Sequence, residues 1–219
     1  PCTAKVTVII PDTGVKGEIR FRRYKSYDIW QTASMARRGD TLTGTLPLLP
    51  PAGKVMYQVT LSDGDQRILL NEKPAVLRYT GFVPRPILIP HIIFMFLAML
   101  FSTLAGFLAV FRIRGSYLYA CLTVITLLIG GLILGPVVQK FAFGEFWTGW
   151  PFGHDLTDNK AFVTFIFWII ALVVMKKNRD NRLWPVLAAV ILMAVYTIPH
   201  SLLGSEIDFT KGNKTEVVK

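Results

Sequence analysis

Cysteine, histidine and internal charge are scarce in this sequence, and each shortage excludes a class of protein. Two cysteines in 219 residues cannot build the disulfide framework of a small secreted scaffold. Cys2 and Cys121 lie far apart along the chain, and we expect two unpaired thiols. The three histidines show no HxxxH or other spacing of a metal motif. Charged residues make up only 17% of the chain, and four long apolar stretches contain none.

Those four stretches are typical of an integral membrane protein. A helix rises about 1.5 Å per residue and the hydrocarbon core is ~30 Å thick, so about 20 apolar residues span it. The fold class we predict is an N-terminal all-β sandwich over residues 1–85, followed by a four-helix transmembrane bundle in the lipid bilayer over residues 86–204 and a tail over residues 205–219. The apolar stretches are Ile87–Phe111, Ser116–Val138, Ala161–Met175 and Leu183–Leu203. The predicted helices cover residues 87–111, 116–138, 157–175 and 183–203.

Lysine and arginine in the short connectors predict the orientation, because these residues favour the cytoplasm. The connectors after the first and third helices carry six basic residues against one acid, Asp180. The second connector, residues 139–160, and the tail together carry six of the seven acids of the membrane half. We therefore expect an extracytoplasmic N-terminal domain, second connector and C-terminus, in a bacterial inner membrane. Export of that domain predicts a signal peptide or membrane anchor upstream of it.

The first 82 residues show short strand patterns separated by turn residues. Such segments recur about every 8–12 residues, which is typical of a β-sandwich. The sequence Ser-Asp-Gly-Asp at residues 62–65 predicts a hairpin, because Asp-Gly tolerates the positive φ of tight turns. The basic run at residues 20–25 indicates a solvated strand face, with a lipid-headgroup or partner site as the alternative. The predicted strands are Lys5–Ile10, Glu18–Tyr24, Asp28–Ala33, Thr41–Leu46, Val55–Leu61, Arg67–Leu70 and Val76–Tyr79.

Residues 49–59, Leu-Pro-Pro-Ala-Gly-Lys-Val-Met-Tyr-Gln-Val, resemble the tyrosine-corner segment of fibronectin type III and immunoglobulin-like domains. In those domains a corner rich in proline and glycine precedes a strand whose early tyrosine hydrogen-bonds back to the corner. The resemblance implies that Tyr57 makes this bond and that Trp30 is a core tryptophan. It also implies a binding or spacing role for the domain. Nucleic acid is not expected as a partner of an exported domain.

Small residues predict where the membrane helices pack. Gly131 and Gly135 form a GxxxG pair in the second helix, and Ser102 and Gly106 have the same spacing in the first. Small residues four apart let helix backbones approach closely in lipid. The charge-free apolar stretches disfavour a coupled transporter, because such proteins usually place an ionisable residue at mid-membrane depth.

The second connector is the most unusual segment, because it interleaves aromatic residues with glycine. One interpretation is an aromatic belt at the headgroup level, with residue 157 or 158 capping the next helix. The other is a glycine-permitted turn that holds His154 and Asp155 over the bundle between aromatic rings. The interfacial residues of this loop are Trp147, Trp150 and Phe152.

Under this topology His91, His154 and His200 all lie at the outer membrane surface. Together with Asp155 and Glu206 they could hold Zn, Cu, non-haem Fe or a haem. The alternative is three interfacial histidines without a cofactor, and this is the alternative we expect.

Two functions follow from these features. The first, which we favour, is a non-catalytic membrane subunit that docks or stabilises partner subunits of a larger complex through its exported domain and outer loops. The second is a membrane metalloprotein or redox enzyme with a histidine and carboxylate site at the outer face.

Overall fold

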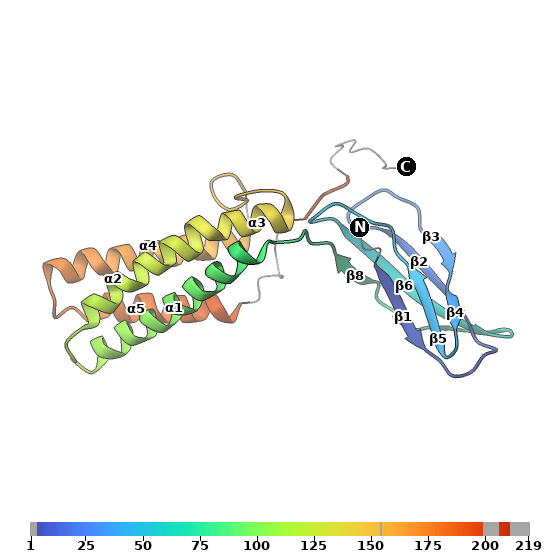
Figure 1. The fold of residues 1–219 in the computed structure, drawn as a ribbon, viewed down its shortest axis with the longest axis horizontal. Coiled ribbons are helices and arrows are strands. Elements are labelled where there is room, and N and C mark those ends of the chain that lie inside the picture. Colours follow the sequence, from blue (N-terminus) through green and yellow to red (C-terminus); the bar gives the residue numbers. More distant parts are fainter. Residues whose placement is uncertain (1–3, 154, 199–205, 211–219) are drawn as a thin grey trace. The chain divides into compact units, whose positions relative to one another are not determined.

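The computed structural model describes residues 4–153, 155–198 and 206–210 of the chain. These residues divide into two compact units (Figure 1). Residues 4–80 and 206–210 belong to the first unit, the strand domain. Residues 81–198 belong to the second, the helical domain. The short C-terminal piece therefore folds with the N-terminal domain, although a long stretch of sequence separates them.

The strand domain consists of two antiparallel sheets. Its strands are β1 (Lys5–Ile9), β2 (Lys16–Arg23), β3 (Gln31–Ser34), β4 (Ala36–Arg38), β5 (Thr41–Thr45), β6 (Lys54–Asp63), β7 (Gln66–Leu69) and β8 (Ala75–Arg78). One sheet has the order β1-β5-β4, and the other has the order β3-β2-β6-β7 with β8 also paired to β6.

Both sheets contribute to one apolar core, an arrangement compatible with a β-sandwich. Ile19 of β2 and Val55 of β6 are fully buried in the same cluster as Leu42 of β5. Burial of each such side chain contributes roughly 1.5–3 kcal/mol. The close approach of β5 to β2 requires Gly44, where an added Cβ would lie 2.9 Å from the Ile19 Cγ2 atom.

The predicted strands are present, with ends shifted by a few residues, and the predicted hairpin is confirmed. Asp63 pairs with Gln66 across a turn in which Gly64 has a φ of +53°. One strand, β4 (Ala36–Arg38), was not predicted. Its three residues carry two arginines and show no apolar alternation, so the pattern gives no strand signal.

The prediction of a tyrosine hydroxyl that bonds back to the corner named the wrong residue, Tyr57. The hydroxyl that bonds a backbone carbonyl belongs to Tyr79, which donates to the Pro47 oxygen at 2.6 Å. No partner of the Tyr57 hydroxyl is found among the residues that the structure describes. Trp30 is not a core residue either, because the guanidinium groups of Arg20 and Arg22 lie over its ring, 5.2 and 5.0 Å from the centroid.

The helical domain contains α1 (Arg85–Val110), α2 (Ser116–Leu127), the π-helical segment η1 (Leu128–Leu134), α3 (Gly135–Phe143), α4 (Leu156–Lys177) and α5 (Leu183–Thr197). Three helices in the described chain are long and apolar enough to cross a membrane: Arg85–Val110, Ser116–Phe143 and Leu156–Lys177. The prediction of four such helices is therefore only partly confirmed. The helix α5 is apolar but has 15 residues, fewer than the predicted range 183–203.

Small residues bring these helices close together, around a core that includes Trp168 of α4. An added Cβ at Gly106 of α1 would lie 2.7 Å from the Ala189 Cβ of α5, and the neighbouring Ser102 is buried. At Gly130 of η1 an added Cβ would lie 2.9 Å from the Phe94 Cβ of α1. Gly131 and Gly135, the GxxxG pair, leave more room than Gly130. The closest approach of η1 to α1 thus falls one residue before that pair.

Candidate functional site

The connector between α3 and α4, which we call the aromatic connector (residues 144–153 and 155 in the described part of the chain), is a folded loop organised by one buried carboxylate. Asp158, in the first turn of α4, is only 5% exposed. Its Oδ2 atom accepts the backbone N–H groups of Thr148 at 2.7 Å and Gly149 at 3.0 Å, and the Gln139 amide at 3.1 Å. These hydrogen bonds stabilise the buried carboxylate, because hydrogen bonds to a charged acceptor are about twice as strong as bonds between neutral groups.

Asp155 directly precedes α4 and links the loop to the helix through hydrogen bonds. Its side chain accepts the Thr157 N–H at 2.7 Å and the Thr148 hydroxyl at 3.2 Å, and its own N–H donates to the Thr148 carbonyl at 2.9 Å. Asp155 is thus the N-cap, one of the residue types preferred there, in place of the predicted residue 157 or 158. The Asn159 side chain adds a further bond, from the Trp150 N–H at 2.6 Å.

Glycine is required where the aromatic connector touches α4. An added Cβ at Gly149 would lie 2.6 Å from the Asp158 Cβ and 2.8 Å from the Asn159 Oδ1 atom. At Gly153 an added Cβ would collide with the Thr148 carbonyl oxygen. The glycines predicted to permit a turn therefore also let this loop pack directly on the start of the helix.

The rings of the aromatic connector lie on its outer surface. Trp147 and Trp150 both contact Phe162 of α4, with ring centroids 6.4 and 6.3 Å apart. The Trp147 indole also donates to the Trp150 carbonyl at 3.1 Å. Even so, Trp150 is 62% exposed and Phe152 is 84% exposed. The hydrogen bonds to Asp158 hold the loop in shape, and the Trp150 and Phe152 rings remain exposed.

Two charged side chains that the predicted helix 157–175 already included are buried, which was not predicted. The helix begins at Leu156, so it includes the buried residues Asp158 and Lys160. The Lys160 Nζ atom donates to the Ile198 carbonyl at 3.1 Å, just past the end of α5. Nearby, the Tyr196 hydroxyl of α5 donates to the Met95 carbonyl of α1 at 2.7 Å. These bonds tie three helices together at this end of the helical domain.

His91 of α1 is held by the π-helical segment. Its Nδ1 atom lies 2.9 Å from the Gly130 carbonyl oxygen, and because a carbonyl can only accept, Nδ1 carries the proton. In the neutral ring the lone pair is then on Nε2. Single π-helical turns are often found at functional sites, and here the segment places a backbone carbonyl against a histidine.

The predicted metal site stays a prediction. His154 and His200 lie outside the described residues, and within the described ranges no three His, Cys, Asp or Glu side chains gather as metal ligands. Of the other proposed ligands, Asp155 caps α4 and His91 bonds to η1. Glu206 folds with the strand domain, where it forms ion pairs with two lysines.

Glu206 belongs to a charged cluster on the strand domain that we call the tail contact (residues 206–210 with their partners). Its carboxylate pairs with Lys25 and Lys54, while the Ile207 N–H donates to the Ala52 carbonyl at 3.3 Å. Burial alone raises the pKa of Glu206, but hydrogen bonds from both lysines outweigh it and hold the pKa below its ordinary value.

The basic run at residues 20–25 takes part in the same contact. The Arg23 guanidinium lies 4.6 Å from the centroid of the Phe209 ring. It also forms a bidentate pair with Asp28, at 2.6 and 2.8 Å, which lowers the pKa of that carboxyl. This run is therefore partly occupied by the chain's own acids and rings. A sequence pattern cannot reveal the pairing with Glu206 and Phe209, because these two partners are distant in sequence.

Comparison of the chain with protein-family models, with curated proteins and with solved structures found no match.

Proposed function

We propose that this chain is a non-catalytic integral membrane subunit that docks a partner subunit through its aromatic connector and its exported strand domain. One observation carries the proposal: the connector is fixed from beneath by the buried Asp158 carboxylate, and it presents Trp150 and Phe152 outward. A loop that is ordered before binding loses little conformational freedom on association. Large aromatic side chains dominate the energy of many interfaces. The fibronectin type III or immunoglobulin-like character of the strand domain is part of the same proposal.

A four-crossing topology is the second part of the proposal. Residues 206–210 fold with residues 4–80. Along the chain, the helical domain is therefore inserted between two segments that belong to one compact unit. A chain that leaves one side of a membrane and returns to it crosses an even number of times. With three long apolar helices, α5 is then the fourth crossing. Its 15 residues correspond to about 22 Å, so local bilayer thinning or the residues beyond it would make up the difference.

Connector charges supply the proposed orientation, with the strand domain outside a bacterial inner membrane. Six basic residues lie in the connectors after α1 and α4 or in the last turn of α4, and positive charge at helix ends favours the cytoplasm. Reporter fusions after Arg114 and Arg179 should then behave as cytoplasmic, and a fusion after Thr148 should behave as exported. The reverse pattern would overturn the orientation.

Co-purification tests the docking function. The double variant Trp150→Ser/Phe152→Ser removes the two exposed rings without touching the hydrogen bonds of Asp158. Phe111→Ser is the matched control, because Phe111 is also an exposed aromatic residue but lies at the opposite end of α1 from His91. Extraction in mild detergent should yield a fixed set of partner subunits with the wild type and the control, and lose them with the double variant. Retention of the same set by all three proteins, or purification of the wild type alone, would contradict the proposal.

A metal site at the outer face is the second candidate, and the geometry of His91 favours it. Histidine ligands commonly donate one ring N–H to a backbone carbonyl while the other nitrogen binds the metal. His91 makes such a bond to Gly130. Metal analysis of purified protein tests this candidate. Stoichiometric Zn, Cu or Fe that is lost in His91→Ala would support it, whereas metal-free protein would exclude it.

A further inference from the structure

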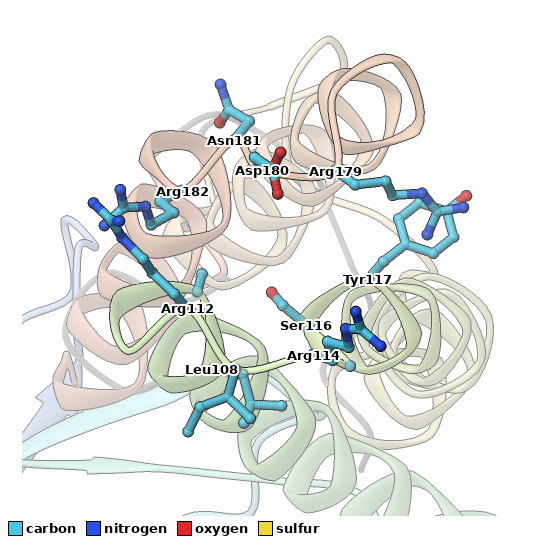
Figure 2. A pocket seen from close by; sticks show the side chains of 12 residues that line it. Leu108, Arg112, Arg114, Ser116, Tyr117, Arg179, Asp180, Asn181 and Arg182 are labelled. Carbon is cyan, nitrogen blue, oxygen red and sulfur yellow. The ribbon is translucent and has the colours of Figure 1, made fainter.

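An open cavity of about 570 Å³ lies between the connector after α1 and the connector after α4 (Figure 2). It is at the end of the helical domain opposite the aromatic connector, since both of these connectors join the other ends of the same helices. Both connectors contribute lining residues: the Arg112 and Arg182 side chains extend toward one edge of it, and the Arg179 side chain extends over the Tyr117 ring at another (Figure 2). Those labelled in Figure 2 are Leu108, Arg112, Arg114, Ser116, Tyr117, Arg179, Asp180, Asn181 and Arg182.

The cavity concentrates positive charge. Four arginines line it against a single carboxylate, Asp180, which leaves a formal surplus of three positive charges. Within the described part of the chain, none of the four guanidinium groups lies within ion-pair distance of a carboxylate. Unpaired cations around one hollow repel each other, and an anion bound between them would relieve that repulsion.

Arginine, rather than charge alone, distinguishes the cavity. Lys176 and Lys177 lie close by, in the last turn of α4, but neither lysine lines it. Net positive charge would be enough to orient a membrane protein, and lysine supplies it as well as arginine does. The guanidinium group differs in its planar fork of N–H donors, which matches the oxygen atoms of a phosphate. The cavity is therefore lined by arginine, a residue that can bind a phosphate group through two N–H donors at once.

One of the arginines is positioned by a ring contact, and another has an unusual backbone conformation. The Arg179 guanidinium lies 3.5 Å from the centroid of the Tyr117 ring, so a side chain from one connector rests on a residue that follows the other. Arg112 has a φ of +59°, in the left-handed region where glycine is favoured and other residues are uncommon. Strained backbone of this kind tends to occur at functional sites. Here the residue with this backbone conformation lines the cavity.

The surroundings of the cavity suit a lipid. Large apolar side chains next to it in sequence are exposed, namely Val110, Phe111 and Leu183. They belong to the ends of helices that are apolar along their length, so acyl chains could lie along them while a headgroup occupies the cavity. Basic pockets between membrane helices are known to bind anionic headgroups.

We propose that this cavity binds the phosphate of an anionic phospholipid, held by Arg112, Arg114, Arg179 and Arg182. Each arginine near a membrane surface contributes roughly a fivefold gain in affinity for anionic lipid. A guanidinium that contacts the phosphate contributes at least that much. The inference does not depend on partner docking by the aromatic connector, and its failure would leave that proposal unaffected.

The test is a titration of the full chain in detergent with phosphatidylglycerol or phosphatidylcholine, followed by native mass spectrometry. Arg112→Gly is the informative variant, because glycine adopts the same φ without strain and the protein should fold at least as well as the wild type. Lys177→Gln is the matched control, with the same loss of charge at the last residue of α4, two residues before Arg179 but outside the cavity. Arg179→Lys keeps the charge and removes the fork.

The wild type should retain phosphatidylglycerol in preference to phosphatidylcholine. Arg112→Gly should weaken that binding about fivefold or more and Arg179→Lys should weaken it measurably, while Lys177→Gln changes it less than twofold. Equal losses in Arg112→Gly and Lys177→Gln, with Arg179→Lys unchanged, would show a diffuse charge effect and overturn the proposal. Inorganic phosphate in the millimolar range is the second arm. If inorganic phosphate does not displace the lipid, the proposal is supported. If inorganic phosphate itself binds tightly and displaces the lipid, the cavity is assigned to soluble phosphate instead.

Discussion

The Asp158 carboxylate accepts the Thr148 backbone N–H at 2.7 Å and thereby fixes a loop that precedes it by ten residues. The same Oδ2 atom accepts the Gly149 N–H and the Gln139 amide. Three N–H donors from two segments therefore converge on one oxygen, and the Thr148 hydroxyl lies 3.3 Å from it. This bond network, more than the aromatic rings, gives the connector its shape.

Replacing Asp158 with Ala should open the aromatic connector. The change leaves two backbone N–H groups and one amide without their acceptor, which should cost about 3 kcal/mol of unfolding free energy. Asp158→Asn keeps one acceptor oxygen and should cost less. Hydrogen exchange of the Thr148 and Gly149 amides measures the effect, with exposed Asp180→Ala as the control. Unchanged protection in Asp158→Ala would show that other contacts hold the loop.

Adjacent glycines of η1 should respond differently to alanine. Gly130→Ala places a Cβ 2.9 Å from the Phe94 Cβ and 3.2 Å from the Met95 nitrogen, so helix α1 has to move. Overpacking of this kind typically costs 1–3 kcal/mol. Gly131→Ala meets nothing closer than 3.8 Å and should be neutral or slightly stabilising. Thermal unfolding of the two variants in detergent measures the difference, and equal melting temperatures would contradict the packing described.

The Tyr79 hydroxyl should stabilise the strand domain where the Tyr57 hydroxyl does not. Tyr79→Phe removes the bond to the Pro47 carbonyl and should cost about 1 kcal/mol, while Tyr57→Phe should be nearly neutral. Burial raises the pKa of Tyr79 above its ordinary value of 10.0, because the phenol is held in its neutral form. Its contribution is thus complete below pH 10 and is lost as pH rises through the raised value. Denaturant titrations of the three proteins would detect this, and a larger loss in Tyr57→Phe would contradict it.

Much of this fold could be predicted from the sequence because local patterns carry it. Alternating strands, the Asp-Gly hairpin and long apolar helices each depend on neighbouring residues. The role of Tyr79, by contrast, depends on a contact with Pro47, a residue 32 positions away. The position of Trp30 depends on its contact with Arg20 and Arg22 of the neighbouring strand β2. The burial of Asp158 and Lys160 was missed for the same reason. A charged residue at the start of an apolar run suggests a helix end exposed to water. The partners of Asp158 come from the folded connector and the partner of Lys160 comes from the end of α5, and neither can be read from the sequence.

The arginine cavity illustrates the same limit. Sequence reasoning counted Arg112, Arg114, Arg179 and Arg182 as orientation signals. It could not place the two connectors against each other, because that depends on how α1 and α2 pack beside α4 and α5. Their convergence is a tertiary property.

Acid should release the tail contact. Because the folded pKa of Glu206 lies below its ordinary value of 4.5, the ion pairs with Lys25 and Lys54 stabilise the contact above that pH. The contribution is lost as pH falls through the lowered pKa. The effect should be small, because the Lys25 side chain is half exposed and surface pairs are weak. The amide chemical shift of Ile207 should titrate in this range and become flat in Glu206→Gln. A shift that is independent of pH in the wild type would contradict the role of the pair.

Photocrosslinking at Phe152 tests the central claim, partner docking by the aromatic connector, most directly. A photoreactive amino acid at this 84% exposed position reports what touches the connector in intact membranes, and the same residue at Phe111 is the control. Docking predicts one protein adduct of defined mass from Phe152 that is absent from Phe111. Lipid adducts alone at Phe152 would show an aromatic belt in the headgroup region and contradict the docking function.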